Sequence, residues 1–159
     1  MSICGLETAI AIKKEVASQY YELLYHGTNA IDDEDVELVK KNGLPARGTN
    51  RDLLQHIEPN GVYAPSAFRG SSALLGKATQ WATGSNPVVF YITGFRGYDV
   101  MEHLGQEIET PGGFRDPVMK ECEIVIPAEV PLKYLLRYAT VTHGWKRPQY
   151  DFYEFKSQQ

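Results

Sequence analysis

The eight residues LLYHGTNA, at positions 23–30, place an apolar run directly before a polar ending. A short apolar run that stops at glycine and polar residues is typical of a buried strand closing at a turn. Taken alone, a histidine at such a strand end is more often structural than functional. His26 is therefore a candidate functional residue only through what the rest of the chain places beside it.

Length and composition predict one domain with a single core over residues 1–159, since 43% of the residues are hydrophobic. The formal charge is 16 − 20 = −4, without a long like-charge block, which argues against a protein that coats nucleic acid. Cys4 and Cys122 lack metal-ligand spacing, so we expect a reducing, cytoplasmic site of action and no metal. No stretch resembles a signal peptide or a membrane span, and a protein delivered into a target cell would share these features.

Periodicity predicts helices early and strands later. Apolar residues at helical spacing predict a helix over 6–22, followed by a strand over 23–26. IDDEDVELVKKNG predicts a second helix, capped by Asp32 or Asp33 and ended by Gly43. The rest is predicted as a loop over 44–60, a strand over 61–64, a short helix capped by Ser71 or Ser72, a second loop over 102–120, and strands over 87–94, 121–127, 134–141 and 150–156. This order favours an α+β domain with a largely antiparallel sheet.

A pair of carboxylates gives the clearest chemical signal. Residues two apart on a strand share a face, so Glu121 and Glu123 are expected to lie side by side at the start of the apolar run IVIP. Neighbouring carboxylates raise the pKa of one of the pair and can stabilise a developing positive charge. The chain has no HExxH, GxSxG, GxxxxGK[ST] or strand-linked GxGxxG motif, which argues against zinc, serine-hydrolase, P-loop and Rossmann sites.

Three segments, LYHGT, NGVYAPS and ECEIVIP, follow one another in the order of the motifs of the ADP-ribosyltransferase superfamily. LYHGT resembles the histidine motif of the diphtheria-toxin and poly-ADP-ribose-polymerase branch, and NGVYAPS is similar to that branch's aromatic segment. ECEIVIP instead resembles the ExE strand of the cholera-toxin-like branch, and GLPARGTN is similar to a loop of those toxins. The resemblance covers residues 23–141 and implies split, largely antiparallel sheets with flanking helices.

The resemblance also implies how NAD, as a substrate, would be bound. His26 would hydrogen-bond the adenosine ribose, the Gly27 backbone would hold the nicotinamide amide, and Thr28 would support the turn. Tyr63 would wall the nicotinamide, and Ser71 or Ser72 would donate to its amide group. Arg47 would approach the pyrophosphate, because a guanidinium suits two phosphate oxygens. The branch's second tyrosine is missing, since the matching region reads ALLGK, which leaves Tyr63, Phe68 and Trp81 as stacking candidates.

The same resemblance makes Glu123 the catalytic residue, binding the nicotinamide ribose and stabilising positive charge as nicotinamide leaves. Glu121 would then orient or activate the nucleophile. An ungapped register through EVPLKYLL exchanges the two roles, although ECEIVIP fits the ExE pattern directly and favours Glu123. The loop and acids over 109–121 would govern the choice of acceptor.

The function that this resemblance implies is NAD-dependent mono-ADP-ribosyl transfer to a macromolecule by a toxin or effector. The net charge favours a protein acceptor and leaves nucleic acid open, and no membrane partner is expected. An inhibitor or immunity protein is a further expected partner. The alternatives are an RNA 2′-phosphotransferase or an NAD glycohydrolase of the same fold, and a non-catalytic module that binds NAD or ADP-ribose.

Overall fold

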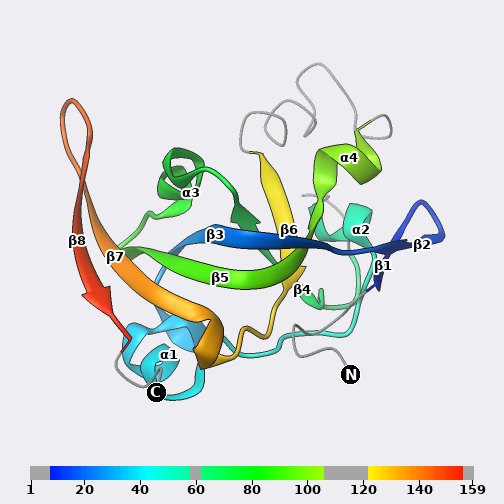
Figure 1. Ribbon diagram of the computed structural model, residues 1–159, viewed down its shortest axis with the longest axis horizontal. Helices are drawn as coiled ribbons and strands as arrows, with labels where there is room; N and C mark the ends of the chain where they lie inside the picture. Colours follow the sequence, from blue (N-terminus) through cyan, green and yellow to red (C-terminus); the bar gives the residue numbers. More distant parts are fainter. Residues whose placement is uncertain (1–7, 58–61, 106–121, 156–159) are drawn as a thin grey trace.

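The computed structural model describes residues 8–57, 62–105 and 122–155. Within these residues, six strands form one sheet, two further strands form a hairpin, and helices pack around them (Figure 1). The strands are β1 Thr8–Ala11, β2 Lys14–Ala17, β3 Gln19–Asn29, β4 Phe68–Ser72, β5 Pro87–Asp99, β6 Glu123–Pro127, β7 Leu135–His143 and β8 Pro148–Glu154. The α-helices are α1 Val36–Asn42, α2 Leu53–Ile57, α3 Leu75–Trp81 and α4 Val100–Leu104, and the 3-10 helices are η1 Asp32–Glu34 and η2 Leu132–Tyr134.

The sheet is antiparallel throughout and is divided along β5. The strand order is β3-β4-β6-β5-β7-β8, and β3 also pairs directly with β5. The first part of β5 lies between β3 and β7, whereas Tyr98 and Asp99 at its end pair with β6. Gly94, with φ of 62°, lies between the residues of β5 that pair with β7 and those that pair with β6. The expected α+β class with split antiparallel sheets is confirmed.

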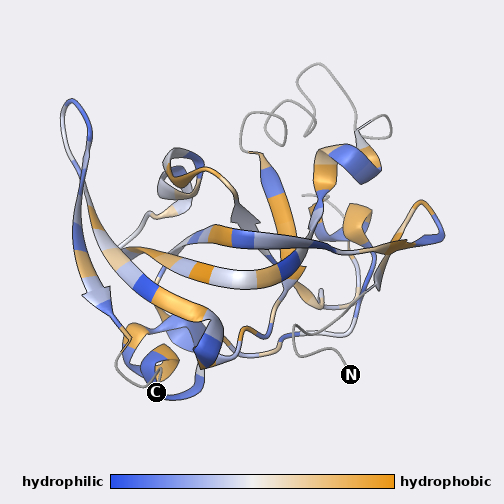
Figure 2. Ribbon diagram, viewed as in Figure 1, coloured by the Kyte–Doolittle hydropathy of each residue, from blue (hydrophilic) through white to orange (hydrophobic). Residues whose placement is uncertain are grey.

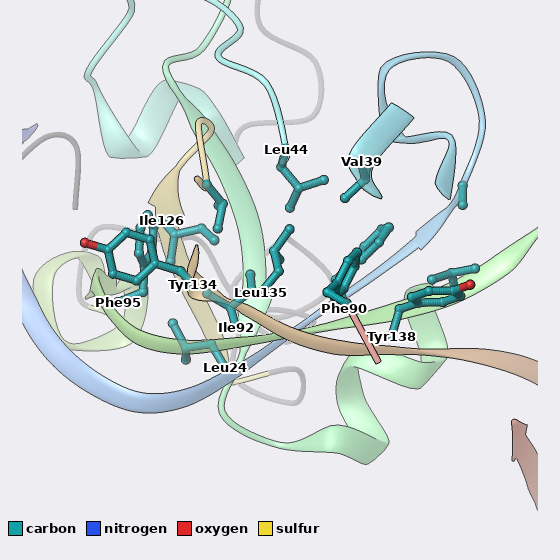
Figure 3. Close-up of a cluster of buried hydrophobic side chains, with 14 of the residues drawn as sticks. Leu24, Val39, Leu44, Phe90, Ile92, Phe95, Ile126, Tyr134, Leu135 and Tyr138 are labelled. Atoms are coloured by element: carbon teal, nitrogen blue, oxygen red, sulfur yellow. The ribbon is translucent and has the colours of Figure 1, made fainter. Parts of the chain in front are cut away.

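One face of the sheet carries the main hydrophobic core (Figure 3). Leu24, Phe90 and Ile92 project from β3 and β5, and each of them is fully buried. Val39 of α1 and Leu44 cover these strands from the other side. The core therefore fixes β3, and with it the polar strand end at residues 26–28, against the centre of the sheet.

The opposite face is covered by α3. Ala78 of this helix and Ala82, directly after it, pack against buried residues of β5 and β7. Gly27 permits the contact with β3, because a Cβ added at this position would lie 1.8 Å from the carbonyl oxygen of Ala78. The glycine of the LYHGT motif is therefore required for packing, since any side chain there would displace α3.

The helix predicted over residues 6–22 is wrong where the structure describes it. Residues 8–17 form the β1–β2 hairpin, and β3 already begins at Gln19. Ala9 and Ala11 are buried while Ile10 between them is exposed, which is the two-residue period of a strand. The apolar spacing of so short a segment fits both periods, and tertiary packing decided between them.

The strand predicted over 61–64 is also wrong within its described part, because residues 62–64 are not in a strand. A strand, β4, lies further along the chain and includes Ser71 and Ser72, so these serines do not cap a helix. The helix α3 begins at Leu75. Arg, Gly and Ser have poor strand propensity, but β6 pairs with all five residues of β4. Pairing with a buried neighbour therefore outweighed local preference.

Elsewhere the predictions needed smaller changes. The helix after η1 is capped by Asp35, not by Asp32 or Asp33, and Gly43 ends it with φ of 75°. The predicted loop over 44–60 contains α2. Strands were confirmed in all four later segments, and β5 runs on to Asp99. Within the described residues no helix is long and apolar enough to cross a membrane.

Candidate active site

A pocket of about 320 Å³ lies where the two parts of the sheet meet α2 and α3. It gathers residues that are almost a hundred positions apart in the sequence. Its lining comprises His26 and Gly27 of β3, His56 of α2, Gly70 of β4, Trp81 of α3 and Glu123 of β6. Two segments singled out in the sequence, LYHGT and ECEIVIP, therefore meet in one pocket.

Glu123 is the first residue of β6 and pairs with Ser72 of β4. Its side chain is only 15% exposed. A Cβ added at Gly70 would approach the Glu123 carboxylate to 3.1 Å, so this glycine keeps room for it. A largely desolvated carboxylate at a pocket wall interacts strongly with any positive charge that develops beside it. Glu121 lies outside the described residues.

His56 faces Glu123 across the pocket, with 4.0 Å between its Nε2 and the carboxylate Oε2. Its Nδ1 lies 2.7 Å from Ser66 Oγ, which itself accepts a hydrogen bond from the Phe68 amide. Burial, together with the positive charge of Arg47, lowers the pKa of His56 to about 4. The imidazole is therefore neutral at pH 7.

His56 was missed in the sequence, because its four histidines were tested only for metal-ligand spacing. The available signal was a histidine within a long loop region, where functional side chains concentrate. Within the described residues, no group of three or more His, Cys, Asp or Glu is arranged to hold a metal ion.

His26 is held by the protein through both ring nitrogens. Nδ1 donates to the Gly70 carbonyl oxygen at 2.6 Å, and Nε2 donates to Glu34 Oε2 at 2.5 Å. A carbonyl oxygen and a carboxylate can only accept, so both nitrogens carry a proton and the ring is an imidazolium. A ribose contact through either nitrogen would require one of these bonds to be exchanged, and the ribose role of His26 stays a prediction.

Glu34 is the centre of a buried polar network that the sequence did not reveal. It accepts hydrogen bonds from His26, Thr28 and the Arg69 guanidinium, and its side chain is 8% exposed. Burial alone would raise the pKa of Glu34, but the hydrogen bond and charge of His26, together with Arg69, hold it well below its usual range. Arg69 also donates to the carbonyl oxygens of Ala128 and Pro45.

This network joins the LYHGT strand end to β4 and η1. Thr28 Oγ1 donates to Glu34 Oε1 at 2.5 Å, and the role of Thr28 at the NAD site stays a prediction. Arg69 could have indicated this network in the sequence, because an arginine inside a buried strand is rare unless its charge is paired. That strand itself was misplaced in the sequence, so its arginine was not considered.

Arg47 lies beside this network rather than in the pocket lining. Its Nε donates to Asp33 at 3.1 Å, and its guanidinium lies 3.3 Å from Glu34. Arg47 lines a second pocket of about 360 Å³ together with Gly48, Thr49, Arg51 and the segment after β6. Its side chain remains 38% exposed, so part of the guanidinium faces solvent.

The two serines are fully buried, and they bond to β6 and to the residue directly before it. Ser71 Oγ donates to the Ile124 carbonyl oxygen at 2.7 Å, and Ser72 Oγ to that of Cys122 at 3.3 Å. These bonds fasten β4 to the strand that carries Glu123. Among the three aromatic stacking candidates, Trp81 lines the pocket, Phe68 is 1% exposed in the core, and Tyr63 lies outside the lining with 42% exposure.

Solved structures of similar shape decide the fold. A structure described as a guanine-specific ADP-ribosyltransferase superposes with a TM-score of 0.64 at 18% identity, over 90% of this chain and 82% of that chain. The chain has an ADP-ribosyltransferase-like fold. EcPltA matches with a TM-score of 0.61 at 17% identity, over 85% of this chain and 86% of that chain.

A variant of scabin, a toxin from Streptomyces scabies, has the same ADP-ribosyltransferase-like fold, with a TM-score of 0.58 at 17% identity, over 86% of this chain and 76% of that chain. A further guanine-specific ADP-ribosyltransferase structure is described with NADH and GDP. No protein-family model matches the chain, and no curated protein matches its sequence. At identities this low, the structural matches establish the fold alone. The chemistry must be argued from the pocket.

Proposed function

We propose that this chain is an NAD-dependent mono-ADP-ribosyltransferase that modifies a macromolecular acceptor. The observation that carries the proposal is the Glu123 carboxylate, partly buried in one pocket with Gly27 and Trp81 within an ADP-ribosyltransferase-like fold. A toxin or effector role agrees with scabin being described as a toxin.

The pocket would take the nicotinamide-ribose end of NAD. A volume of about 320 Å³ suits that end of the molecule and not the whole dinucleotide. Trp81 would stack on the nicotinamide ring, and the Gly27 backbone lies beside the same space. The neighbouring pocket with Arg47 would receive the pyrophosphate, because its guanidinium is partly exposed.

In the reaction, the bond between the nicotinamide nitrogen and ribose C1′ breaks, and its electron pair neutralises the pyridinium. Positive charge then develops on the ribose, where the Glu123 carboxylate stabilises it by proximity and low local dielectric. An acceptor N–H or O–H group attacks C1′, forms the new glycosidic bond and loses its proton. The attack is complete when a base takes the proton that the acceptor loses.

His56 is our candidate for that base. With Nδ1 donating to Ser66, Nε2 would present its lone pair to the pocket beside Glu123. The lowered pKa of His56, to about 4, keeps the imidazole unprotonated at pH 7. Glu121 remains the alternative that the sequence suggests.

The proposal is tested by incubating the full chain with labelled NAD, separately with a cell lysate, single-stranded DNA and GDP. Glu123→Gln should abolish labelling, and Glu22→Gln, an exposed carboxylate on β3, should leave it unchanged. Nuclease and protease digestion then identify the acceptor class. Free ADP-ribose without a labelled acceptor would replace this proposal with NAD hydrolysis, and an absence of NAD binding and turnover would overturn it.

A further inference from the structure

We propose that the β7–β8 hairpin is a docking surface for single-stranded nucleic acid. We infer further that such a strand carries the acceptor, and this second step rests on the proposed function. The hairpin lies outside the pocket and extends beyond the sheet, toward the top of the view in Figure 1.

The tip of the hairpin combines an aromatic ring with positive charge. β7 and β8 pair as far as His143 and Pro148, so residues 144–147, Gly-Trp-Lys-Arg, form the connecting turn. Trp145 is 96% exposed, and Lys146 and Arg147 beside it are exposed as well. The tip is also hydrophilic overall (Figure 2). An indole fully in water, flanked by two cations, contributes nothing to the core and is suited to stack on a base between phosphates.

Two aromatic side chains of β8 lie on the same face of the hairpin, where Tyr150 is partly buried against α3 and Phe152 is more exposed. Tyr150 and Phe152 of β8 are stacked with ring centroids 5.9 Å apart, and Phe152 is 50% exposed. The Arg137 guanidinium lies over the rings of Phe152 and Tyr91, at 5.9 and 5.8 Å. Aromatic rings on a strand face, interleaved with arginine, are the usual platform on which successive bases stack.

The hairpin is fastened to the helix that carries Trp81. His143 Nε2 donates to the Ala82 carbonyl oxygen at 2.6 Å, directly after Trp81 in the chain. Thr79 Oγ1 and the Tyr150 hydroxyl lie 2.8 Å apart, which makes a second link between α3 and β8. A nucleic-acid strand bound to the hairpin would therefore be held at a fixed position relative to the pocket.

Charge favours a nucleic acid over a protein partner. The chain as a whole carries −4, yet residues 135–150 contain Arg137, Lys146 and Arg147 and no acid. Of the two acids that follow, Glu154 is paired with Arg137 at 3.3 Å. This local reversal of sign attracts phosphates, while the acidic remainder limits binding elsewhere on the molecule.

The test measures fluorescence anisotropy of fluorescein-labelled 12-nucleotide single-stranded DNA and RNA with the full chain, without NAD and over a range of salt. Trp145→Ala should weaken binding roughly ten-fold or more. Changing both Lys146 and Arg147 to Ala should lower the salt slope by about 1.4, at about 0.7 per phosphate contact. The matched control changes Lys13 and Lys14, exposed on the β1–β2 hairpin, and should bind as the wild type does.

Circular dichroism and the remaining Trp81 fluorescence show whether each variant is folded. No binding at low salt, or equal losses in the control, would overturn the surface, as would hairpin variants that lose only a protein acceptor. Nucleic-acid binding without any ADP-ribosyl transfer would retain the docking surface and overturn the proposed function. If all hairpin variants transfer ADP-ribose as well as the wild type does, the proposed function would be retained and the docking surface overturned.

Discussion

At the scale of single residues, the site depends on buried charges that compensate one another. His26 and Arg69 bring two positive charges to one carboxylate, that of Glu34, and all three side chains are nearly inaccessible. Breaking a buried pair by removing one partner is costly, because the remaining charges stay desolvated. Glu34 is thus the residue on which the LYHGT strand end depends.

Glu34→Gln should reduce the free energy of unfolding by about 3–5 kcal/mol, the usual cost of an uncompensated buried charge. Urea denaturation measures this change. Glu37→Gln is the matched control, since Glu37 is exposed and paired only with Lys40, and it should change stability by less than about 1 kcal/mol. A loss of the same size in both variants would contradict the role of Glu34.

The lowered pKa of Glu34 also predicts a pH dependence. Its contribution to stability is fully present above the ordinary pKa of about 4.5 and is lost as the pH falls below that value. Unfolding of the wild type should therefore become easier below pH 4.5, and this acid limb should be flatter in Glu34→Gln. Identical acid limbs would show that Glu34 is not held ionised.

His56 gives a separate pH window. Its pKa is lowered from 6.5 to about 4, so the unfolded chain takes up a proton before the folded protein does. Stability is full above pH 6.5 and falls as the pH drops toward 4, by at most about 3.5 kcal/mol at about 1.4 kcal/mol per pKa unit. His56→Gln should remove this dependence. Glu123, Ser66 and Arg47 are the polar groups that interact with the ring, and all three are kept in this variant.

At the scale of elements, the position of α3 is set by one glycine. Gly27→Ala places a methyl group against the Ala78 carbonyl oxygen, where only 1.8 Å is available, so α3 must move together with Trp81. We expect a lower melting temperature and weaker NAD binding. Gly76→Ala within α3 is the control, because nothing lies within 4 Å of its added Cβ, and helix propensity predicts a gain of up to about 1 kcal/mol. Equal effects of the two changes would refute this packing role.

Some elements could be predicted from the sequence because local preference and tertiary packing agree. β5 is rich in β-branched and aromatic residues and is buried on both faces, and Gly43 ends α1 in a left-handed conformation. β4 could not be predicted, because its strand character comes from β6 pairing with Arg69, Gly70 and the serines.

The candidate site was predicted only in part for a related reason. His26, Gly27 and Glu123 do meet in one pocket, since sequence motifs mark the strand ends that carry them. His56, Glu34 and Arg69 carry no motif, and their importance arises from long-range contacts between α2, η1 and β4. Tyr63 lies outside the pocket lining, because the segment that contains it precedes β4 and is not part of the sheet.

At the scale of the whole molecule, the divided sheet creates the pocket. β5 pairs with β3 from Pro87 to Gly97 and with β6 at Tyr98 and Asp99, so β5 joins the strand that carries LYHGT to the strand that carries Glu123. The β7–β8 hairpin joins the same assembly through α3. The candidate pocket and the proposed docking surface are thus connected through α3.

We propose that Glu123 drives the departure of nicotinamide from bound NAD. The most direct measurement compares nicotinamide release and NAD affinity for the wild type, Glu123→Gln and Glu22→Gln. We predict that Glu123→Gln releases nicotinamide roughly 100- to 1,000-fold more slowly, that its NAD affinity changes little, and that Glu22→Gln matches the wild type. Release at the wild-type rate by Glu123→Gln would show that Glu123 does not drive this step.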